Sequence, residues 1–169
     1  AVELGGTLAI IPSQAENDYI YSLLSATGII SDGLSWSPDG GSAMYAWIGA
    51  SDAVSEGNWK WEDGTTLSTD SSSGSYSNWG SGTDYYGNAF SEPDNTYYVD
   101  DYQNYLAIGL ESWPYGAPFS LGSAGQWNDL NGNNKLAYVV EVPNASVTNN
   151  APVASNDTAI TTNEDTVYN

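Results

Sequence analysis

Carboxylate and amide side chains gather around a single proline, just ahead of an apolar segment. The stretch AFSEPDNTYYVDDYQNYLAI, residues 89–108, has Glu92 and Asp94 on either side of Pro93. A cis Glu92–Pro93 bond would turn both side chains to one side of the loop, although Asp and Pro beside each other also suit an ordinary turn. The residue types therefore allow either a solvated acidic loop or a set of oxygen ligands.

A second set of side-chain oxygens lies further along the chain. In GQWNDLNGNN, Asn128 and Asp129 follow Trp127 directly. Calcium takes six to eight oxygen ligands at about 2.3–2.6 Å and tolerates irregular geometry, so two loops can share one ion. The segment DLNGNN lacks the twelfth-position glutamate of an EF-hand loop, and we expect it to be a hairpin turn.

The composition removes most other site chemistries. The 169 residues carry 21 acidic and only two basic side chains, a formal net charge of -19. Such a surface repels phosphate backbones and anionic lipids, which argues against nucleic-acid and membrane binding. Because histidine and cysteine are absent, the usual general base, thiol nucleophile, zinc ligands and disulfides are absent too.

Paired carboxylates also occur in glycoside hydrolases. Those enzymes hold two acids about 5–10 Å apart and raise the pKa of one by burial. The acids near Pro93 stand in a polar segment that suits a metal, and a bound cation lowers carboxyl pKa values. We therefore predict that the chain is no enzyme.

One helix and several short strands must position these residues. SQAENDYIYSLLSATG predicts a helix that Ser13 and Glu16 begin with a capping box and that Gly28 ends. Its predicted apolar face consists of Ala15, Tyr19, Ile20, Leu23 and Leu24. Predicted strands cover residues 43–50, 58–64, 104–110 and 135–142.

Between the second and third strands lies a loop of roughly forty residues, a length that is uncommon unless the loop is functional or disordered. Its tryptophans and tyrosines favour an ordered, metal-braced loop, since disordered segments are poor in aromatics. Five tryptophans are expected in the core: Trp47, Trp59, Trp61, Trp79 and Trp127.

Several motifs in a fixed order carry a family resemblance. GGTLAIIPSQAEN, WIGASDAVSEGNWKWEDG, YSNW, EPD, NYLAIGL and GQWNDLNGNNKLAYVVE together resemble a C-type lectin-like domain over residues 1–143. The resemblance implies an α+β fold with small antiparallel sheets, one or two helices and a long calcium-braced loop region. The first strand and most of the first helix of the family pattern are not found in this chain. Tyr105 stands where animal members have a cysteine, as in the cysteine-free versions from large bacterial RTX-type adhesins.

The polar residues 144–169 are expected to form a linker and the start of a following β-sandwich repeat. APVASNDTAITTNEDT resembles the opening of the cadherin-like or immunoglobulin-like repeats of large bacterial adhesins.

The resemblance implies a principal Ca²⁺ site, which two vicinal sugar hydroxyls complete. The carried-over ligands are Glu92, Asp94, Gln103, Asn128 and Asp129. Gln103 stands where the family usually has a glutamate, and the charge of Asp94 compensates; Asp100 or Asp101 is the alternative to Gln103. Glu92 matches the mannose and fucose binders, whereas Asp94 matches the galactose binders.

The resemblance also implies an auxiliary metal site, formed by Asp52, Glu56, Asn95 and Asn104. Trp113, Tyr115 and Phe119 lie on an irregular loop, ESWPYGAPFSLG. Their rings either stack on a sugar or pin the loop to the core, and we include Trp113 and Tyr115 among the candidate ligand contacts.

The expected function is calcium-dependent carbohydrate binding by an extracellular adhesin module, at a bacterial cell surface or secreted, with roles in cell adhesion and biofilm. Its partners would be host, algal or microbial surface glycans, with fucose- or mannose-like diols favoured, bound by a monomeric module. Two alternatives remain: a calcium-stabilised module that binds a protein or peptide, since a fold does not fix its ligand, and a spacer that calcium merely stiffens.

Overall fold

The structure is a computed structural model that describes residues 2–29, 33, 35–70, 74–99 and 101–143. The expected linker and repeat at residues 144–169, and the candidate ligand Asp100, lie outside the described residues. Among the described residues, no helix has both the length and the apolar character needed to cross a membrane.

Helix α1, Gln14–Ala26, confirms the predicted helix and its N-cap. The Ser13 side chain accepts a hydrogen bond from the Glu16 backbone N–H at 3.2 Å. The predicted apolar face is only partly right, because Ala15 and Tyr19 are exposed. The buried residues of the helix are Asn17, Ile20 and Leu24.

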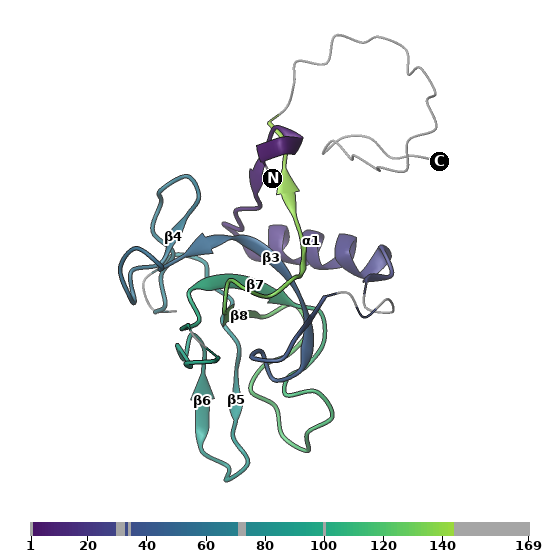
Figure 1. Ribbon diagram of the computed structural model, residues 1–169, viewed down its shortest axis with the longest axis vertical. Coiled ribbons are helices and arrows are strands. Elements are labelled where there is room, and N and C mark those ends of the chain that lie inside the picture. The colour runs from purple at the N-terminus through teal and green to yellow at the C-terminus, as the bar shows by residue number, and fades with distance from the viewer. Residues whose placement is uncertain (1, 30–32, 34, 71–73, 100, 144–169) are drawn as a thin grey trace.

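A six-stranded sheet around β3, Ala43–Ser51, forms the centre of the fold (Figure 1). Its other strands are β2 (Trp36–Ser37), β4 (Lys60–Trp61), β7 (Tyr105–Gly109), β8 (Trp127–Leu130) and β9 (Ala137–Tyr138). The order is β2-β3-β7-β8, and β4 and β9 also pair with β3. The predicted strands at 43–50 and 104–110 are confirmed, whereas the one at 58–64 shortens to β4.

The two ends of the described chain meet in a separate pair of strands. β1, Thr7–Leu8, pairs antiparallel with β10, Val140–Glu141, just after the short 3-10 helix Val2–Leu4. The predicted strand at 135–142 is thus divided between two sheets. Gly49 allows β1 to pass close to β3, because a Cβ there would overlap the carbonyls of Leu8 and Ala9.

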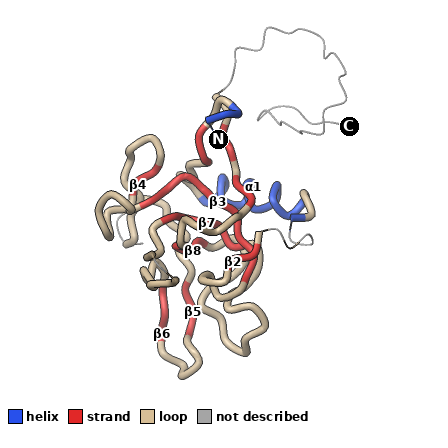
Figure 2. The backbone as a smooth tube through the Cα atoms, in the orientation of Figure 1, coloured by secondary structure: helices blue, strands red, loops and turns tan. Residues whose placement is uncertain are grey.

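The predicted long loop contains a hairpin that the sequence did not reveal. β5, Ser81–Thr83, pairs with β6, Ala89–Ser91, and the two project away from the main sheet (Figures 1 and 2). Its loop closes through a hydrogen bond from the Asp84 N–H to the Asn88 carbonyl, and Gly87 adopts a positive φ of 82°. This part of the loop therefore has regular structure, in keeping with its aromatic content.

The core is built around Trp127, which is fully buried. Rings of Trp61, Tyr76 and Trp79 pack edge-on against it at centroid distances of 5.7, 5.5 and 6.1 Å. Trp59 and Trp61 are buried as predicted, while Trp47 and Trp79 are only partly buried.

Asn17 connects helix α1 to this core. Its side chain accepts from the Trp127 indole N–H at 2.7 Å and donates to the Gly125 carbonyl at 2.9 Å. A buried amide costs little when its hydrogen bonds are made, which explains a polar residue on the buried face of the helix.

Replacing Asn17 by alanine should lower the free energy of unfolding by about 1–3 kcal/mol, because the Trp127 indole N–H is left buried without a partner. Denaturant unfolding measures the change. Ser22→Ala, on the exposed side of the same helix, should change stability by less than about 0.5 kcal/mol. Equal losses in both variants would contradict this role for Asn17.

Candidate metal centre

Two neighbouring segments bring the predicted ligands together. Asn128 and Asp129 lie on β8, and Glu92 follows β6 directly. The Gly80 N–H donates to the Trp127 carbonyl and the Glu92 N–H donates to the Gly80 carbonyl, both at 2.8 Å. Residue 80 therefore joins the two segments through main-chain hydrogen bonds. The Glu92–Pro93 bond is cis, as the sequence suggested.

Glu92, Asp94 and Asp129 form a compact acidic cluster. One carboxylate oxygen from each lies within 4.8 Å of the others. Glu92 and Asp129 are buried, with 6% and 0% of their surface exposed, and Asp94 is exposed. Asp129 accepts hydrogen bonds from the Asp94 N–H at 3.2 Å and the Asn95 N–H at 2.8 Å, so it also fixes the proline loop.

Gln103 and Asp101, two further predicted ligands of the principal site, differ in their relation to this cluster. Gln103 is buried, and its Oε1 accepts from the Thr96 N–H at 3.0 Å, the same N–H that Asp94 accepts at 3.1 Å. Its Nε2 donates to the Asp39 carbonyl, so Gln103 braces the loop. Asp101 is exposed, accepts from the Tyr102 N–H and does not belong to the acidic cluster.

A cavity of about 330 Å³ joins the acidic cluster to the predicted auxiliary site. Its lining includes Glu92, Asp129, Asp52, Glu56 and Asn95. Within the described part of the chain, three buried side-chain oxygens have no hydrogen-bond partner, and all three belong to lining residues: Glu92 Oε2, Asp52 Oδ1 and Asn95 Oδ1. Unpaired buried oxygens are costly, and a cation in the cavity would satisfy them.

Asn104 is the one predicted auxiliary residue that does not line this cavity. Its main chain accepts from the Asp52 N–H at 3.2 Å, so it lies beside the site through its backbone. Glu56 is exposed at the cavity, whereas Asp52 is buried.

The electrostatics of the cavity favour a cation. Burial raises the pKa of Glu92, and the charges of Asp129 and Asp94 raise it further. Burial likewise raises the pKa of Asp129, with Asp94 adding to the effect. Burial raises the pKa of Asp52 to about 6. A cation among these carboxylates would oppose all three shifts, because opposite charge favours the ionised form.

The aromatic residues of the irregular loop, Trp113, Tyr115 and Phe119, differ in whether their rings can reach a ligand. Trp113 is 1% exposed, so its ring offers no face to a ligand and the predicted ligand contact is wrong for this residue. Instead its indole N–H donates to Glu92 Oε1 at 3.1 Å. Tyr115 is 67% exposed and stays a candidate contact, while Phe119 is half-buried and packs against Tyr85.

Sequence reasoning missed Tyr45 and the hydrogen bond from Trp113 to Glu92. Tyr45 is fully buried, and its hydroxyl accepts from Asn128 Nδ2 at 3.0 Å. Tyr45 stands in the apolar strand β3, where the sequence suggested only core packing. No local pattern distinguishes a core tyrosine that contacts a ligand residue from one that does not.

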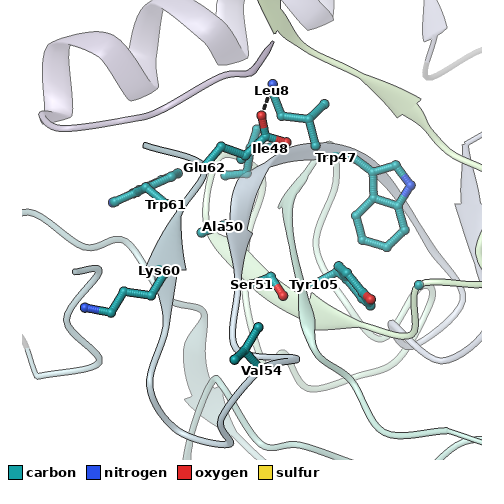
Figure 3. A pocket seen from close by; sticks show the side chains of 12 residues that line it. Leu8, Trp47, Ile48, Ala50, Ser51, Val54, Lys60, Trp61, Glu62 and Tyr105 are labelled. Carbon is teal, nitrogen blue, oxygen red and sulfur yellow. Dashed lines mark hydrogen bonds between the residues drawn. The ribbon is translucent and has the colours of Figure 1, made fainter. Parts of the chain in front are cut away.

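A separate apolar hollow of about 550 Å³ lies across β3 and β4 (Figure 3). Trp47 and Tyr105 stand at one side of it, Lys60 stands at the other, and Val54 lies at its lower edge in this view. None of the predicted oxygen ligands lines this hollow. This hollow is therefore separate from the smaller cavity beside Glu92 and Asp129.

Comparison with known proteins places this geometry in a family. The Lectin C-type domain profile matches residues 2–141, so the chain belongs to the C-type lectin domain family. C-type lectin domains are generally extracellular, non-enzymatic carbohydrate binders, and the family typically binds Ca²⁺. The predicted fold, α+β with one helix and small antiparallel sheets, is confirmed.

Solved structures of this family are similar to the chain at low identity. The carbohydrate-recognition domain of the mouse scavenger receptor C-type lectin is 20% identical, with a TM-score of 0.41, over 82% of this chain and 68% of that one. C-type lectin CEL-I from Cucumaria echinata is 23% identical, with a TM-score of 0.47, over 82% and 70%. The human scavenger receptor domain is 23% identical, with a TM-score of 0.43, over 76% and 66%. The chain thus spans about two thirds of the length of these structures. No protein with a curated description matches the sequence.

Without metal, the buried acids should make stability fall as pH rises. An acid whose pKa is higher in the folded than in the unfolded state keeps its proton to a higher pH when the protein is folded. Its contribution to the free energy of unfolding is therefore complete at low pH and is lost as pH rises. The contribution of Asp52 to stability is lost between pH 3.8 and about pH 6. The raised pKa values of Glu92 and Asp129 extend the loss of stability to higher pH. Thermal melts in chelator across this range measure the slope.

Glu92→Gln should reduce this slope, because the neutral amide does not titrate. The matched control is Asp63→Asn, an exposed acid whose pKa is lowered by hydrogen bonds from Thr65 and which should not reduce it. Saturating calcium should abolish the decline, because the ion binds the ionised carboxylates. A metal-free protein that gains stability over this range would contradict the assignment.

Proposed function

We propose that this domain binds Ca²⁺ through the acidic cluster and presents the ion to vicinal hydroxyls of a neutral glycan. The ligands are Glu92, Asp94, Asn128 and Asp129, with Gln103 or Asp101 completing the principal site. The observation that carries this proposal is the set of unpartnered buried oxygens around one cavity. In a chain without histidine or cysteine, these hard oxygens suit calcium better than zinc.

A second calcium ion would occupy the Asp52 side of the same cavity. Asp52 Oδ1 and Asn95 Oδ1 are its buried ligands, and Glu56 is the exposed one. Asn104 would complete the set that the family resemblance implies. This ion would brace the proline loop, because Asn95 follows Asp94 directly.

A neutral diol is the ligand class that fits the charge of the protein. With a net charge of -19, the surface disfavours sialylated, sulfated or phosphorylated glycans. Glu92 favours fucose- or mannose-like diols, while Asp94 retains galactose as the competitor. The setting is an extracellular bacterial adhesin that binds host, algal or microbial surface glycans, where several copies would supply avidity to a weak single site.

The exposed aromatic residues favour one alternative, a protein or peptide ligand. Tyr85 and Tyr86 at the β5–β6 hairpin are 72% and 84% exposed, and Phe119 packs beside Tyr85. Tyrosine is enriched at protein interfaces, where one end of the ring is apolar and the other is wet. In this alternative calcium stabilises the loops and the ligand lies on the hairpin.

Calorimetric titration with CaCl₂ should detect binding that depends on the buried carboxylates. Asp129→Asn should weaken it at least about tenfold, or 1.4 kcal/mol, because a charged ligand becomes neutral. Asp63→Asn removes the same charge from an exposed turn and should leave the affinity unchanged. Equal weakening in both variants would show that only diffuse charge attracts the ion.

A glycan array should show calcium-dependent binding to neutral glycans with terminal fucose or mannose. Chelator should abolish this binding, and so should Asn128→Ala, because the metal shell and the diol contacts share that side chain. Calcium binding without any glycan binding would favour the protein ligand. Glycan binding that survives both treatments would contradict the site.

A further inference from the structure

The Trp113 indole occupies a slot lined by glycines. A Cβ at Gly80, Gly109 or Gly122 would overlap the indole carbons, so only glycine at these positions leaves room for the ring. The Trp113 main chain is fixed as well, since its N–H donates to the Gly122 carbonyl at 3.1 Å and its carbonyl accepts from Leu121 at 2.8 Å. The indole therefore has one position and one orientation.

This orientation directs the indole N–H at the carboxylate of Glu92. The hydrogen bond to Oε1 is 3.1 Å long and buried, and Oε2 has no partner. The Trp113 indole N–H thus fixes Oε1 of Glu92, and Oε2 remains available to bind a cation.

Tyr45 acts in a corresponding way on Asn128. The Gly40 carbonyl can only accept, so the Tyr45 hydroxyl donates to it, at 2.7 Å. The Tyr45 oxygen must then accept its other hydrogen bond, which comes from Asn128 Nδ2 at 3.0 Å. Because the amide nitrogen is committed to Tyr45, the amide oxygen is the Asn128 atom left for a ligand.

The two rings support each other on the protein side of the cluster. Their centroids are 5.5 Å apart, with an interplanar angle of 57°. Burial raises the pKa of the Tyr45 phenol, so the hydroxyl stays neutral and keeps its proton for Gly40. A phenylalanine at either position would fill much of the same space and would lack the polar atom that contacts the ligand residue.

We propose that Trp113 and Tyr45 are positioning residues that set the orientation of Glu92 and Asn128 for cation binding. This inference rests on the proposed calcium site and adds two residues that do not touch the ion. Replacing a residue that hydrogen-bonds to a metal ligand, without itself contacting the metal, typically lowers metal affinity 10- to 100-fold. Trp113 thus supports the site from within the core, in place of stacking on a sugar.

The test compares the calcium affinity of the folded wild-type protein with that of Trp113→Phe and Tyr45→Phe by calorimetry. Each variant should bind calcium at least about tenfold more weakly. Trp61→Phe is the matched control, since Trp61 is another buried tryptophan, whose ring packs edge-on against Trp127 in the core, and the calcium affinity of this variant should be unchanged. Circular dichroism in chelator confirms that each variant is folded at the temperature of the titration.

A double-variant cycle separates positioning from general packing. If Trp113 acts through Glu92, then Trp113→Phe should have little further effect on calcium affinity in a Glu92→Gln background. A loss of the same size in both backgrounds would overturn the role of Trp113, because packing does not depend on the Glu92 carboxylate.

A spectroscopic measurement on the unchanged chain applies even if Trp113→Phe fails to fold. The indole ¹⁵N–¹H signal of Trp113, assigned through its own side-chain correlations, should shift on addition of calcium, while that of Trp61 should not. A fixed Trp113 signal in a protein that binds calcium would overturn the inference. Unchanged affinity in both phenylalanine variants would also overturn it and leave the proposed function standing, whereas a wild-type protein that binds no calcium overturns both.

Discussion

Mutual repulsion between buried carboxylates is the constraint on which the rest of this structure depends. Glu92 and Asp129 are buried within 4.8 Å of each other and of Asp94, in a protein with a net charge of -19. The chain has only two basic residues, Lys60, whose ammonium donates to the Thr66 hydroxyl, and Lys135. Such an arrangement is stable only if protons or a cation neutralise it, since an uncompensated buried charge costs several kcal/mol. Binding of the proposed cation would therefore be coupled to folding in this domain.

The fold holds the acidic cluster beside β8, a strand whose residues are all buried. β8 carries Asn128 and Asp129 at the centre of the core, because Trp127 beside them is enclosed by aromatic rings and held by Asn17. Asp129 in turn holds the proline loop through two main-chain N–H groups. The cluster thus joins β8, whose four residues are all buried, to the proline loop, so neutralising its charge would stabilise both.

Part of this arrangement can be predicted from the sequence. The helix cap at Ser13 and the apolar run of β3 follow from local patterns, whereas the sequence only allowed a cis bond before Pro93. The proposed ligand set comes from a family resemblance over several motifs, and three of its members, Glu92, Asp94 and Asp129, lie together in the structure. Other features depend on contacts between distant residues and have no local signal. Trp113 enters the core because three glycines from separate segments leave space for it, and Asn17 is buried because Trp127 is its partner. The division of residues 135–142 between two sheets depends on where β1 and β3 lie.

Anomalous diffraction from a crystal grown with calcium tests the central claim most directly. The account predicts a calcium peak about 2.3–2.6 Å from oxygens of Glu92, Asn128 and Asp129. A structure in which Glu92 and Asp129 share a proton or an ordered water, with calcium bound only elsewhere, would contradict it.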